Sequence, residues 1–238
     1  MSLLVLRPRL RHTSSCIWLH GLGDSGQGWL DGVNVLAAAL PSTKFILPTA
    51  KAIPVTLNGG MAMPAWYNLA GGADRADEKC EGLDASIALV RSLLAEEVEG
   101  GVPIGACVVG GFSQGAALAL SVGLRQPAGE ALAGVVALSG YLPHIKSIGE
   151  FATPAGVSTR FRMWHGDSDP MVLPEYGTAS VGALEAAGAD VRMSMIPGLA
   201  HSVTIEELQE CADEIKLFVP RVEEEGGEGG GGEREGKL

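Results

Sequence analysis

The feature that most constrains the fold is a six-residue turn, Gly-Gly-Phe-Ser-Gln-Gly, over residues 110–115. An apolar run over 107–109 precedes it and an alanine- and leucine-rich run over 116–120 follows it, which predicts a buried strand, a tight turn and a buried helix. A G-x-S-x-G sequence in that context is typical of a nucleophile elbow, where the flanking glycines let strand and helix approach closely. We therefore expect Ser113 to stand exposed above a sheet. The motif also occurs by chance in a chain with 34 glycines, so a base and an acid must follow it.

Length and composition favour one large domain. The chain has 238 residues, 46% of them hydrophobic, which suffices for one substantial core, and we place a single domain over residues 1–221. Residues 222–238 are rich in glutamate and glycine and cannot bury apolar area, so a disordered tail is expected there. The formal net charge of -11 argues against nucleic acid as a partner, since phosphate binding needs clustered Lys and Arg.

The four cysteines indicate a reducing, cytoplasmic location. Cys16, Cys80, Cys107 and Cys211 form no C-x-x-C pair, and three of them lie in apolar runs, where a free thiol acts as a small hydrophobic side chain. No apolar run approaches the roughly 20 residues that span a bilayer. We therefore expect a soluble protein whose contact with membranes is at most transient.

The N-terminal segment carries Arg7, Arg9 and Arg11 with no acidic residue before Asp24. This pattern allows a transit peptide, but the segment is short and not clearly amphipathic. A short edge strand over residues 3–6, forming a hairpin with the next strand, is the favoured interpretation.

Apolar runs alternate with helical patterns along the rest of the chain. Continuous apolar runs suit strands covered on both faces, whereas alternating apolar and polar residues suit a strand nearer a sheet edge. Strands alternating with helices imply an α/β protein with a mostly parallel central sheet and helices on both faces. Buried strands are expected over residues 16–19, 45–47, 107–109, 134–138 and 161–164, an edge strand over 191–195, and helices over 29–40, 81–99, 116–120, 174–187 and 205–219.

Residues 49–80 lack periodicity, and a connection this long is usually functional or disordered. We expect a packed loop beside a functional site, because the segment contains several large apolar side chains. These are Met61, Met63, Trp66, Tyr67 and Leu69.

Three loops at predicted strand ends carry a candidate catalytic triad. In open parallel sheets, sites form at the carboxyl ends of the strands. Asp169 comes 56 residues after Ser113, and His201 comes 32 residues after Asp169. The chain order Ser, Asp, His is that of the α/β-hydrolase fold and differs from the order in other serine hydrolase folds.

Chemistry explains why these residue types belong together. A serine hydroxyl is a poor nucleophile until a base accepts its proton, and His201 can accept that proton and later donate it to a leaving group. A buried carboxylate, here Asp169, fixes the imidazole tautomer and stabilises the imidazolium. The glycine-rich turn over residues 20–26 can point backbone N–H groups into a cavity, so the amides of Leu22 and Gln114 are the expected oxyanion hole.

Other histidines and carboxylates in these loops have structural interpretations. His20 and His165 are expected to hold their loops by hydrogen bonds. Asp167 follows Gly166 and is expected to form the turn, which leaves Asp169 for the triad. A metal site made of His165, Asp167 and Asp169 is the alternative, but carboxylates in short loops cap turns far more often, so we expect no metal and no cofactor.

Five segments carry motifs shared with a known family, and they cover residues 20–26, 58–67, 110–115, 165–170 and 198–202. Together they resemble the acyl-protein thioesterase/carboxylesterase family of α/β hydrolases, with a plant-type member favoured. The resemblance implies the α/β-hydrolase fold, a triad of Ser113, Asp169 and His201, and oxyanion amides at Leu22 and Gln114. It also implies hydrolysis of thioesters of palmitoylated proteins, with lysophospholipids, short acyl esters and, in plants, acetylated proteins as alternatives.

The resemblance further implies an apolar acyl channel beside the serine. Its walls are expected on the flanking loops, at Met63, Trp66, Tyr67, Leu69, Met171, Val172 and Tyr176. Where family thioesterases carry a longer apolar lid, this chain has small residues over 70–73, which predicts a preference for medium over long acyl chains. Position 2 is Ser, so the N-terminal Cys that some members use for their own palmitoylation is absent.

A non-catalytic binding protein on a hydrolase scaffold is the rival from another functional class. The complete triad and both oxyanion loops favour the enzyme. The expected partners are S-acylated proteins, small acyl esters or lysophospholipids, and the expected state is a monomer or a weak homodimer.

Overall fold

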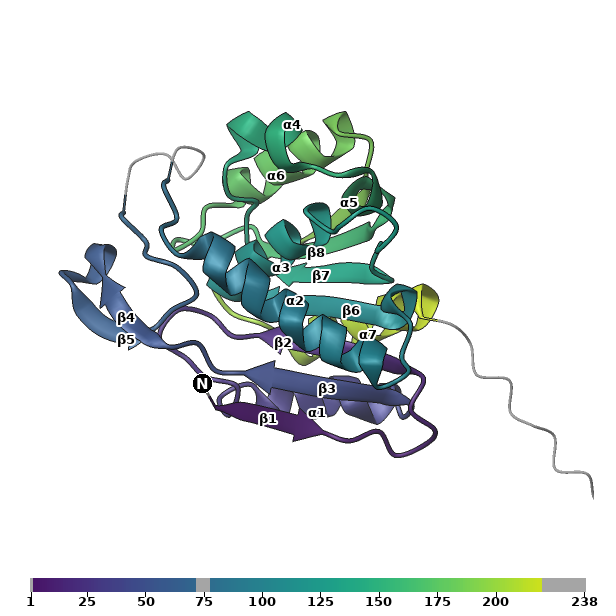
Figure 1. Cartoon of the computed structure of the whole chain (residues 1–238). Coiled ribbons are helices and arrows are strands. Elements are labelled where there is room, and N and C mark those ends of the chain that lie inside the picture. The colour runs from purple at the N-terminus through teal and green to yellow at the C-terminus, as the bar shows by residue number, and fades with distance from the viewer. Residues whose placement is uncertain (1, 72–77, 220–238) are drawn as a thin grey trace, which may run out of the picture.

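The computed structural model describes residues 2–71 and 78–219. Its centre is a seven-stranded sheet with the order β1-β3-β2-β6-β7-β8-β9 (Figure 1). All neighbouring strands are parallel except β1, which runs antiparallel to β3. The prediction of a mostly parallel sheet is therefore confirmed. The strands are β1 (Leu3–Leu6), β2 (Ser14–Leu19), β3 (Thr43–Pro48), β6 (Cys107–Phe112), β7 (Gly134–Leu138), β8 (Arg160–Gly166) and β9 (Asp190–Ile196).

Helices cover both faces of the sheet, because successive residues of each strand point to opposite sides. Cys16 and Trp18 of β2 face a core shared with α1 and α7. Ile17 and Leu19 of the same strand face a core shared with α2, α3 and α6. The long helices are α1 (Leu30–Ala39), α2 (Leu83–Glu99), α3 (Gln114–Leu124), α6 (Pro174–Ala186) and α7 (Ile205–Phe218), and the short ones are α4 (Ile148–Phe151) and α5 (Pro154–Ser158).

The N-terminal strand is an edge strand, but the predicted hairpin with the next strand is wrong. β1 pairs with β3, with Leu3 opposite Pro48. The connection from β1 to β2 explains the difference, because the N–H groups of Arg9 and Leu10 donate to the carbonyl oxygen of Pro41 at 2.8 and 2.9 Å. Because of these bonds, the connection runs alongside the start of β3 before β2 begins. β1 therefore lies next to β3 and not next to β2. β2 then uses both of its edges for parallel pairing, with β3 and β6.

The segment predicted to be irregular contains a β-hairpin. β4 (Ala52–Val55) pairs antiparallel with β5 (Met61–Pro64), and a 3-10 turn, η1 (Thr56–Asn58), lies between them. The hairpin projects from the body of the molecule (Figure 1). Each strand contains a proline, at Pro54 and Pro64, which argued against strands in the sequence. A two-stranded ribbon consists of edge strands only, and edge strands tolerate proline.

The expected packed loop follows this hairpin. Trp66, Tyr67 and Leu69 are buried in the core, as predicted, whereas Met61 is 66% exposed. Residues 72–77, which include part of the predicted small lid, lie outside the described residues, and so does the tail expected over 222–238.

Apolar residues at helical spacing were predicted to be buried. Most of them are, but some near the helix ends are exposed. Leu83, Ile87 and Val90 of α2 are buried, but Val98 near its end is 44% exposed. Ile205, the first residue of α7, is also exposed, and that helix begins with a capping box formed by the residue before it. In the part of the chain that the structure describes, no helix is both long and apolar enough to cross a membrane.

Candidate active site

Ser113 stands at the junction of β6 and α3, as the elbow motif predicts. Its φ of 54° and ψ of -118° are strained for a residue with a side chain. A Cβ on Gly111 would lie 2.7 Å from the Leu19 carbonyl oxygen, and one on Gly115 would lie 2.2 Å from the same atom. Both positions therefore require glycine if β6 and α3 are to stay in contact with β2.

The three predicted triad residues lie within hydrogen-bonding distance of one another. Ser113 Oγ is 2.9 Å from Nε2 of His201, and Nδ1 of His201 is 2.6 Å from Oδ2 of Asp169. In the neutral tautomer that this pattern favours, Nδ1–H donates to the carboxylate and Nε2 accepts from the hydroxyl. The ring of Phe112 lies 4.7 Å from the imidazole, centroid to centroid, and packs against it. The arrangement can move a proton from the serine to the histidine.

Asp169 is held by donors on both carboxylate oxygens. Its Oδ1 accepts from the N–H groups of Met171 and Val172 at 2.8 and 3.0 Å, while Oδ2 accepts from the triad histidine. The residue is 2% exposed. A buried carboxylate that accepts from three donors is held in a fixed orientation, and it fixes the orientation of the imidazole in turn.

His165 holds the same loop, as predicted, and also reaches the triad carboxylate. Its Nε2 lies 2.8 Å from the carbonyl oxygen of Val172 and 3.5 Å from Oδ2 of Asp169. Burial lowers the pKa of His165, against opposing effects of the Val172 hydrogen bond and the Asp169 charge. The neutral ring donates through Nε2–H. Gly177 makes room for it, since a Cβ there would lie 2.8 Å from Nδ1.

Asp167 forms the turn that the sequence predicts for it. Its exposed carboxylate accepts from the N–H of Gly198 at 2.7 Å and from the hydroxyl of Ser168 at 2.9 Å. The first of these bonds joins the loop after β8 to the loop after β9. Asp167 therefore stabilises the pair of loops that carry Asp169 and His201, while lying outside the hydrogen bonds of the triad.

The two predicted oxyanion amides lie on the turns that flank the nucleophile. Gln114 is the first residue of α3, where helix amides have no intrahelical acceptor. Leu22 lies in the turn after β2, and the N–H of its neighbour Gly23 donates to Pro64 at 2.8 Å. The end of β5 thus holds the turn that carries Leu22. Leu22 and Gln114 therefore stay the predicted oxyanion donors.

The side chain of Gln114 links the elbow to the loop after β5. Its Oε1 accepts from the N–H of Trp66 at 2.9 Å, and its Nε2 donates to the carbonyl oxygen of Tyr67 at 2.8 Å. A fully buried side-chain amide with donor and acceptor both satisfied fixes the loop relative to the nucleophile.

His20 supports the turn on the other side, as predicted. Its Nδ1 lies 2.6 Å from the carbonyl oxygen of Gly21, and its Nε2 accepts from the N–H of Ala50 at 3.0 Å, so Nδ1 carries the proton. Burial lowers the pKa of His20. The indole of Trp66 lies 4.9 Å from this ring and donates to the carbonyl oxygen of His20 at 2.8 Å.

The seven expected channel residues divide into supporting and surface-reaching side chains. Trp66 and Tyr67 are 2% and 0% exposed, so in this conformation they support the loop. Leu69 and Val172 are also buried, and Met63 and Tyr176 are partly buried against the same core. Met171 is 65% exposed beside the Asp169 loop. Of the seven, Met171 is thus the most exposed side chain.

Glu78 is a structural residue of the site that sequence reasoning missed. It is 4% exposed, and its Oε1 accepts from the N–H groups of Ala70 and Gly71 at 2.8 and 3.3 Å. Its Oε2 accepts from the hydroxyl of Tyr141 at 3.1 Å, and that hydroxyl lies 3.3 Å from the hydroxyl of Tyr67. No local sequence pattern marks Glu78 for burial, because its partners are two backbone groups earlier in the same loop and the hydroxyl of Tyr141, 63 residues away.

Metal ligands were the alternative for the loop after β8. Among residues 2–71 and 78–219, no group of three or more His, Cys, Asp or Glu side chains is arranged to hold an ion. The carboxylates of that loop accept hydrogen bonds instead, from backbone N–H groups at 2.7 to 3.0 Å.

The sheet order, the elbow and the loop positions define an α/β hydrolase. The chain belongs to the phospholipase/carboxylesterase family, which matches it over residues 2–219. The resemblance inferred from the five motifs is therefore confirmed.

Relatives from fungi and plants match most of the chain. Acyl-protein thioesterase 1 of Neurospora crassa is 38% identical over 237 residues, which cover 93% of this chain and 96% of that protein. Acyl-protein thioesterase 2 of Zea mays has a solved structure with a TM-score of 0.78 and 30% identity, covering 91% of this chain and 98% of that one. Arabidopsis thaliana SOBER1 matches with a TM-score of 0.79 at 29% identity, covering 87% and 99% of the two chains.

Proposed function

We propose that the protein is a serine hydrolase that cleaves acyl thioesters and esters, acting as an acyl-protein thioesterase through an acyl-enzyme on Ser113. The observation that carries the proposal is the chain of hydrogen bonds from Ser113 Oγ through His201 to Asp169, at 2.9 and 2.6 Å. The relatives named acyl-protein thioesterase support the choice of substrate class. S-acylated proteins would be the partners, and the cytoplasm the location.

The first half of the reaction forms the acyl-enzyme. Nε2 of His201 accepts the proton of the Ser113 hydroxyl while Oγ attacks the acyl carbonyl carbon. The developing oxyanion accepts hydrogen bonds from the amides of Leu22 and Gln114, a kind of interaction worth about 3 to 4 kcal/mol per donor in the transition state. Asp169 stabilises the imidazolium, which then donates its proton to the departing sulfur or oxygen.

The second half releases the acid. A water molecule takes the place of the leaving group, His201 accepts a proton from it, and its oxygen attacks the acyl carbon bound to Ser113. The same two amides stabilise the second oxyanion. Collapse of that intermediate returns the proton to Oγ and frees the carboxylic acid.

A carboxylesterase or lysophospholipase, or a protein deacetylase, is the second candidate, and it would act on shorter acyl groups. It is favoured by the small residues over 70–73, of which 72 and 73 lie outside the described residues. A non-catalytic ligand-binding scaffold is the remote alternative, and the closeness of the three triad side chains weighs against it.

Active-site labelling separates the enzyme from the scaffold. A fluorophosphonate probe should label the wild-type protein and leave the Ser113→Ala variant unlabelled. Equal labelling of both proteins, or of neither, would contradict the serine hydrolase assignment. Thioester turnover on a palmitoylated peptide, with the matching oxygen ester as control, then tests the thioesterase assignment.

A chain-length series separates the two enzyme candidates. Each buried methylene contributes about 0.8 kcal/mol, or about fourfold in kcat/KM, while the pocket wall continues beside it. With p-nitrophenyl esters from acetyl to palmitoyl, we expect kcat/KM to rise to medium chains and then level off. A steady rise through palmitoyl would show that other residues close the channel and would favour depalmitoylation.

A further inference from the structure

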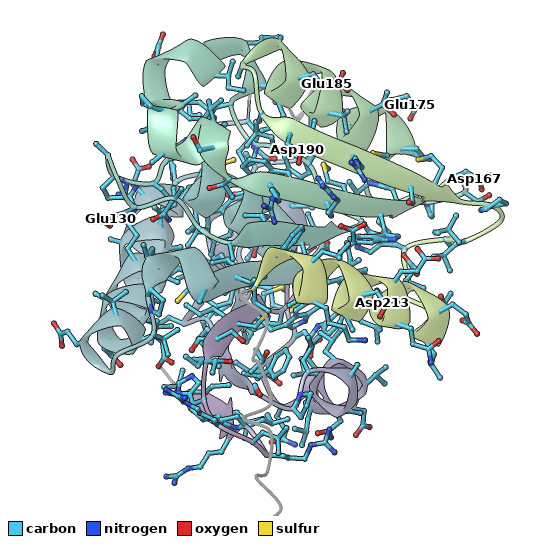
Figure 2. All side chains as sticks on the ribbon, turned by 90° about the vertical axis from the view of Figure 1, so that its right-hand side faces the viewer. Glu130, Asp167, Glu175, Glu185, Asp190 and Asp213 are labelled. Atoms are coloured by element: carbon cyan, nitrogen blue, oxygen red, sulfur yellow. The ribbon has the colours of Figure 1, made fainter. Side chains whose placement is uncertain are left out.

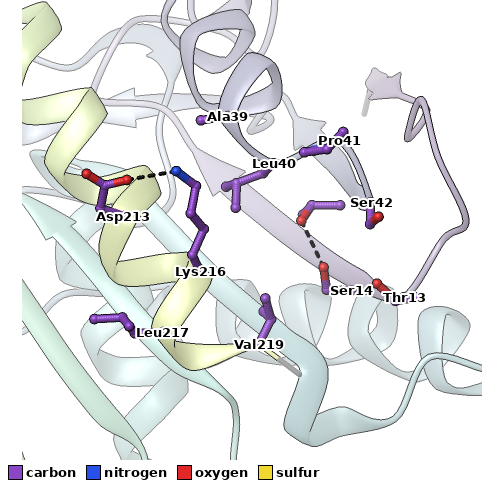
Figure 3. Close-up of a pocket in the computed structure, with 11 residues that line it drawn as sticks. Thr13, Ser14, Ala39, Leu40, Pro41, Ser42, Asp213, Lys216, Leu217 and Val219 are labelled. Atoms are coloured by element: carbon purple, nitrogen blue, oxygen red, sulfur yellow. Dashed lines mark hydrogen bonds and ion pairs between the residues drawn. The ribbon is translucent and has the colours of Figure 1, made fainter. Parts of the chain in front are cut away.

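A groove crosses the end of the sheet opposite Ser113. The largest of its three hollows by volume, a pocket of about 580 Å³, lies at the amino ends of β2 and β3, between the carboxyl ends of α1 and α7 (Figure 3). Figure 3 shows Leu40, from the end of α1, and Val219, from the end of α7, on opposite sides of this pocket. The remaining lining residues are Thr13, Ser14, Ala39, Pro41, Ser42, Thr43, Asp213, Lys216 and Leu217.

Two smaller hollows extend the pocket along the β1–β2 connection. A hollow of about 340 Å³ shares Leu40 and Thr43 with the pocket and is also lined by Arg7 and Arg9. A third hollow, of about 530 Å³, shares Arg7 with the second and reaches Lys44. We call the three together the basal groove.

Three exposed arginines lie on the β1–β2 connection, which borders the basal groove. Arg7 and Arg9 line its smaller hollows, and Arg11 directly precedes His12, which also lines one of them. The guanidinium of Arg9 donates to the carbonyl oxygens of Ala37 and Ala38 at 3.0 and 2.7 Å, which neutralises the negative end of α1. Arg7 and Arg11 form no ion pair with any residue that the structure describes.

The nearby carboxylates are already paired. Asp213 accepts from Lys216 at 2.8 Å on the rim, and the buried Glu97 accepts from Lys44 at 2.5 Å and from Ser15 at 2.6 Å. The two free arginines therefore leave a local positive surplus on a chain whose net charge is -11.

Acidic side chains occur at several places around the molecule. Figure 2 shows Asp167 and Glu175 beside β9 and α6, and also Asp213, which lines the groove and is paired with Lys216. The unpaired positive charge lies at Arg7 and Arg11, so an acidic segment would be attracted to that part of the groove.

The chain supplies such a segment where the described structure stops. Val219 lines the groove, and Val222 is followed directly by Glu223, Glu224 and Glu225. An extended residue spans at most about 3.6 Å, so Glu225 can lie up to about 22 Å from Val219. Val222 is apolar and could enter the pocket. The three glutamates that follow it would then lie near the arginines.

We propose that the basal groove binds the chain's own segment 222–225, with Val222 against Leu40 and the glutamates beside Arg7 and Arg11. Because the segment is tethered three residues away, its effective concentration at the groove is in the millimolar range, and weak intrinsic affinity suffices for occupancy. The ion pairs are exposed, so salt weakens the contact.

Two other occupants fit the site less well. An anionic membrane bound here would hold Ser113 at the far end of the sheet, away from acyl groups anchored in that membrane. A second copy of the chain would have to bring its own acidic surface to a groove that the tethered segment reaches first.

Paramagnetic relaxation in the full-length protein tests the proposal. All four native cysteines are buried, so a nitroxide can be placed selectively with Gly226→Cys. The proposal predicts broadening of the amides of Arg7, Arg11 and Ser42 at 0.1 M salt. Raising salt to 1 M shortens the screening length from about 10 to about 3 Å and should lower these effects about threefold or more.

The matched control replaces all three glutamates by Gln on the same labelled chain, which keeps length and tether unchanged. It should lose the broadening at Arg7 and Arg11, and Arg7→Gln with Arg11→Gln should lose it at Ser42. Broadening that survives either change, or that spreads evenly over the surface, would overturn the proposal. So would broadening that grows with protein concentration, which indicates a second copy, or that appears only with phosphatidylserine vesicles.

Discussion

At the carboxyl ends of β6, β8 and β9, polar side chains lie close together and each has a partner, whereas on the β1–β2 connection, at the other end of the sheet, two arginines stand in solvent. Asp169 is 2% exposed and accepts from three donors at 3.0 Å or less. Arg7 and Arg11 are exposed and make no ion pair within the described part of the chain. Hydrogen bonds therefore fix the geometry of the triad, whereas no ion pair within the described residues fixes the side chains of Arg7 and Arg11.

Backbone strain follows the same division. Ser113 and Ser139, with φ of 54° and 48°, directly follow β6 and β7 at their carboxyl ends. Such conformations cost on the order of 1 to 3 kcal/mol each and persist where the surrounding structure holds them. The strained residues at the carboxyl ends of the strands thus lower the stability of the fold, while they hold the reacting groups in a fixed arrangement. Substitutions there should affect activity, and those at the amino end should affect charge-dependent contacts.

The largest effect that this comparison predicts is at the nucleophile and base. Ser113→Ala or His201→Ala should lower kcat by roughly 10⁴ to 10⁶, because triad members act as a unit and only oxyanion stabilisation remains. The melting temperature should stay close to that of the wild type. Near-normal turnover by either purified variant would remove the triad assignment.

The next effect separates two carboxylates within the same loop. Asp169→Asn should lower kcat by about 10⁴, because the amide favours the wrong tautomer of His201. Asp167→Asn should cost about 1 kcal/mol of unfolding free energy, through a weaker bond to Gly198, with little loss of kcat. Kinetics and urea unfolding on both variants check this, and a larger kcat loss at Asp167 would reverse the assignment.

A smaller effect concerns the buried histidines of the carboxyl end. Since burial lowers the pKa of His20 and His165, the unfolded chain takes up protons near pH 6.5 that the folded chain does not. Stability should therefore be complete above pH 6.5 and fall as the pH is lowered below it. Urea unfolding at pH 7.5 and 5.5 should show the fall, and His165→Gln, which keeps an N–H donor, should show less of it. An unchanged pH dependence in the variant would mean that His165 is protonated in the folded state.

The smallest effect is expected at the amino end. Arg7→Gln combined with Arg11→Gln should change kcat by less than about twofold and stability by less than about 0.5 kcal/mol, because exposed ion pairs such as those proposed above contribute little. Arg9→Gln is the informative contrast, since it removes two hydrogen bonds to the end of α1 and should lower stability measurably. Loss of activity in the double variant would contradict the independence of the two ends.

The order of strands and helices was open to prediction from local patterns, but pairing in space was not. Continuous apolar runs marked β2, β3, β6, β7 and β8, and alternation marked β9 as an edge. The partner of β1 was missed because it depends on hydrogen bonds to Pro41 across the turn. The β4–β5 hairpin was missed because its prolines argue against strands wherever an edge position is not known in advance.

For the site, the sequence by itself determined which residue types occur at strand ends and in what chain order, since elbow glycines and loop lengths are local properties. These local properties point to Ser113, Asp169 and His201. Tertiary structure alone decided that Trp66 and Tyr67 support the loop, that His165 reaches Asp169, and that Glu78 is buried. The contacts of Trp66 with Gln114 and of Glu78 with Tyr141 join segments distant in the chain, whereas the contact of His165 with Asp169, four residues away, depends on the conformation of one loop. The energies of these contacts depend on burial and on partners that no local pattern encodes.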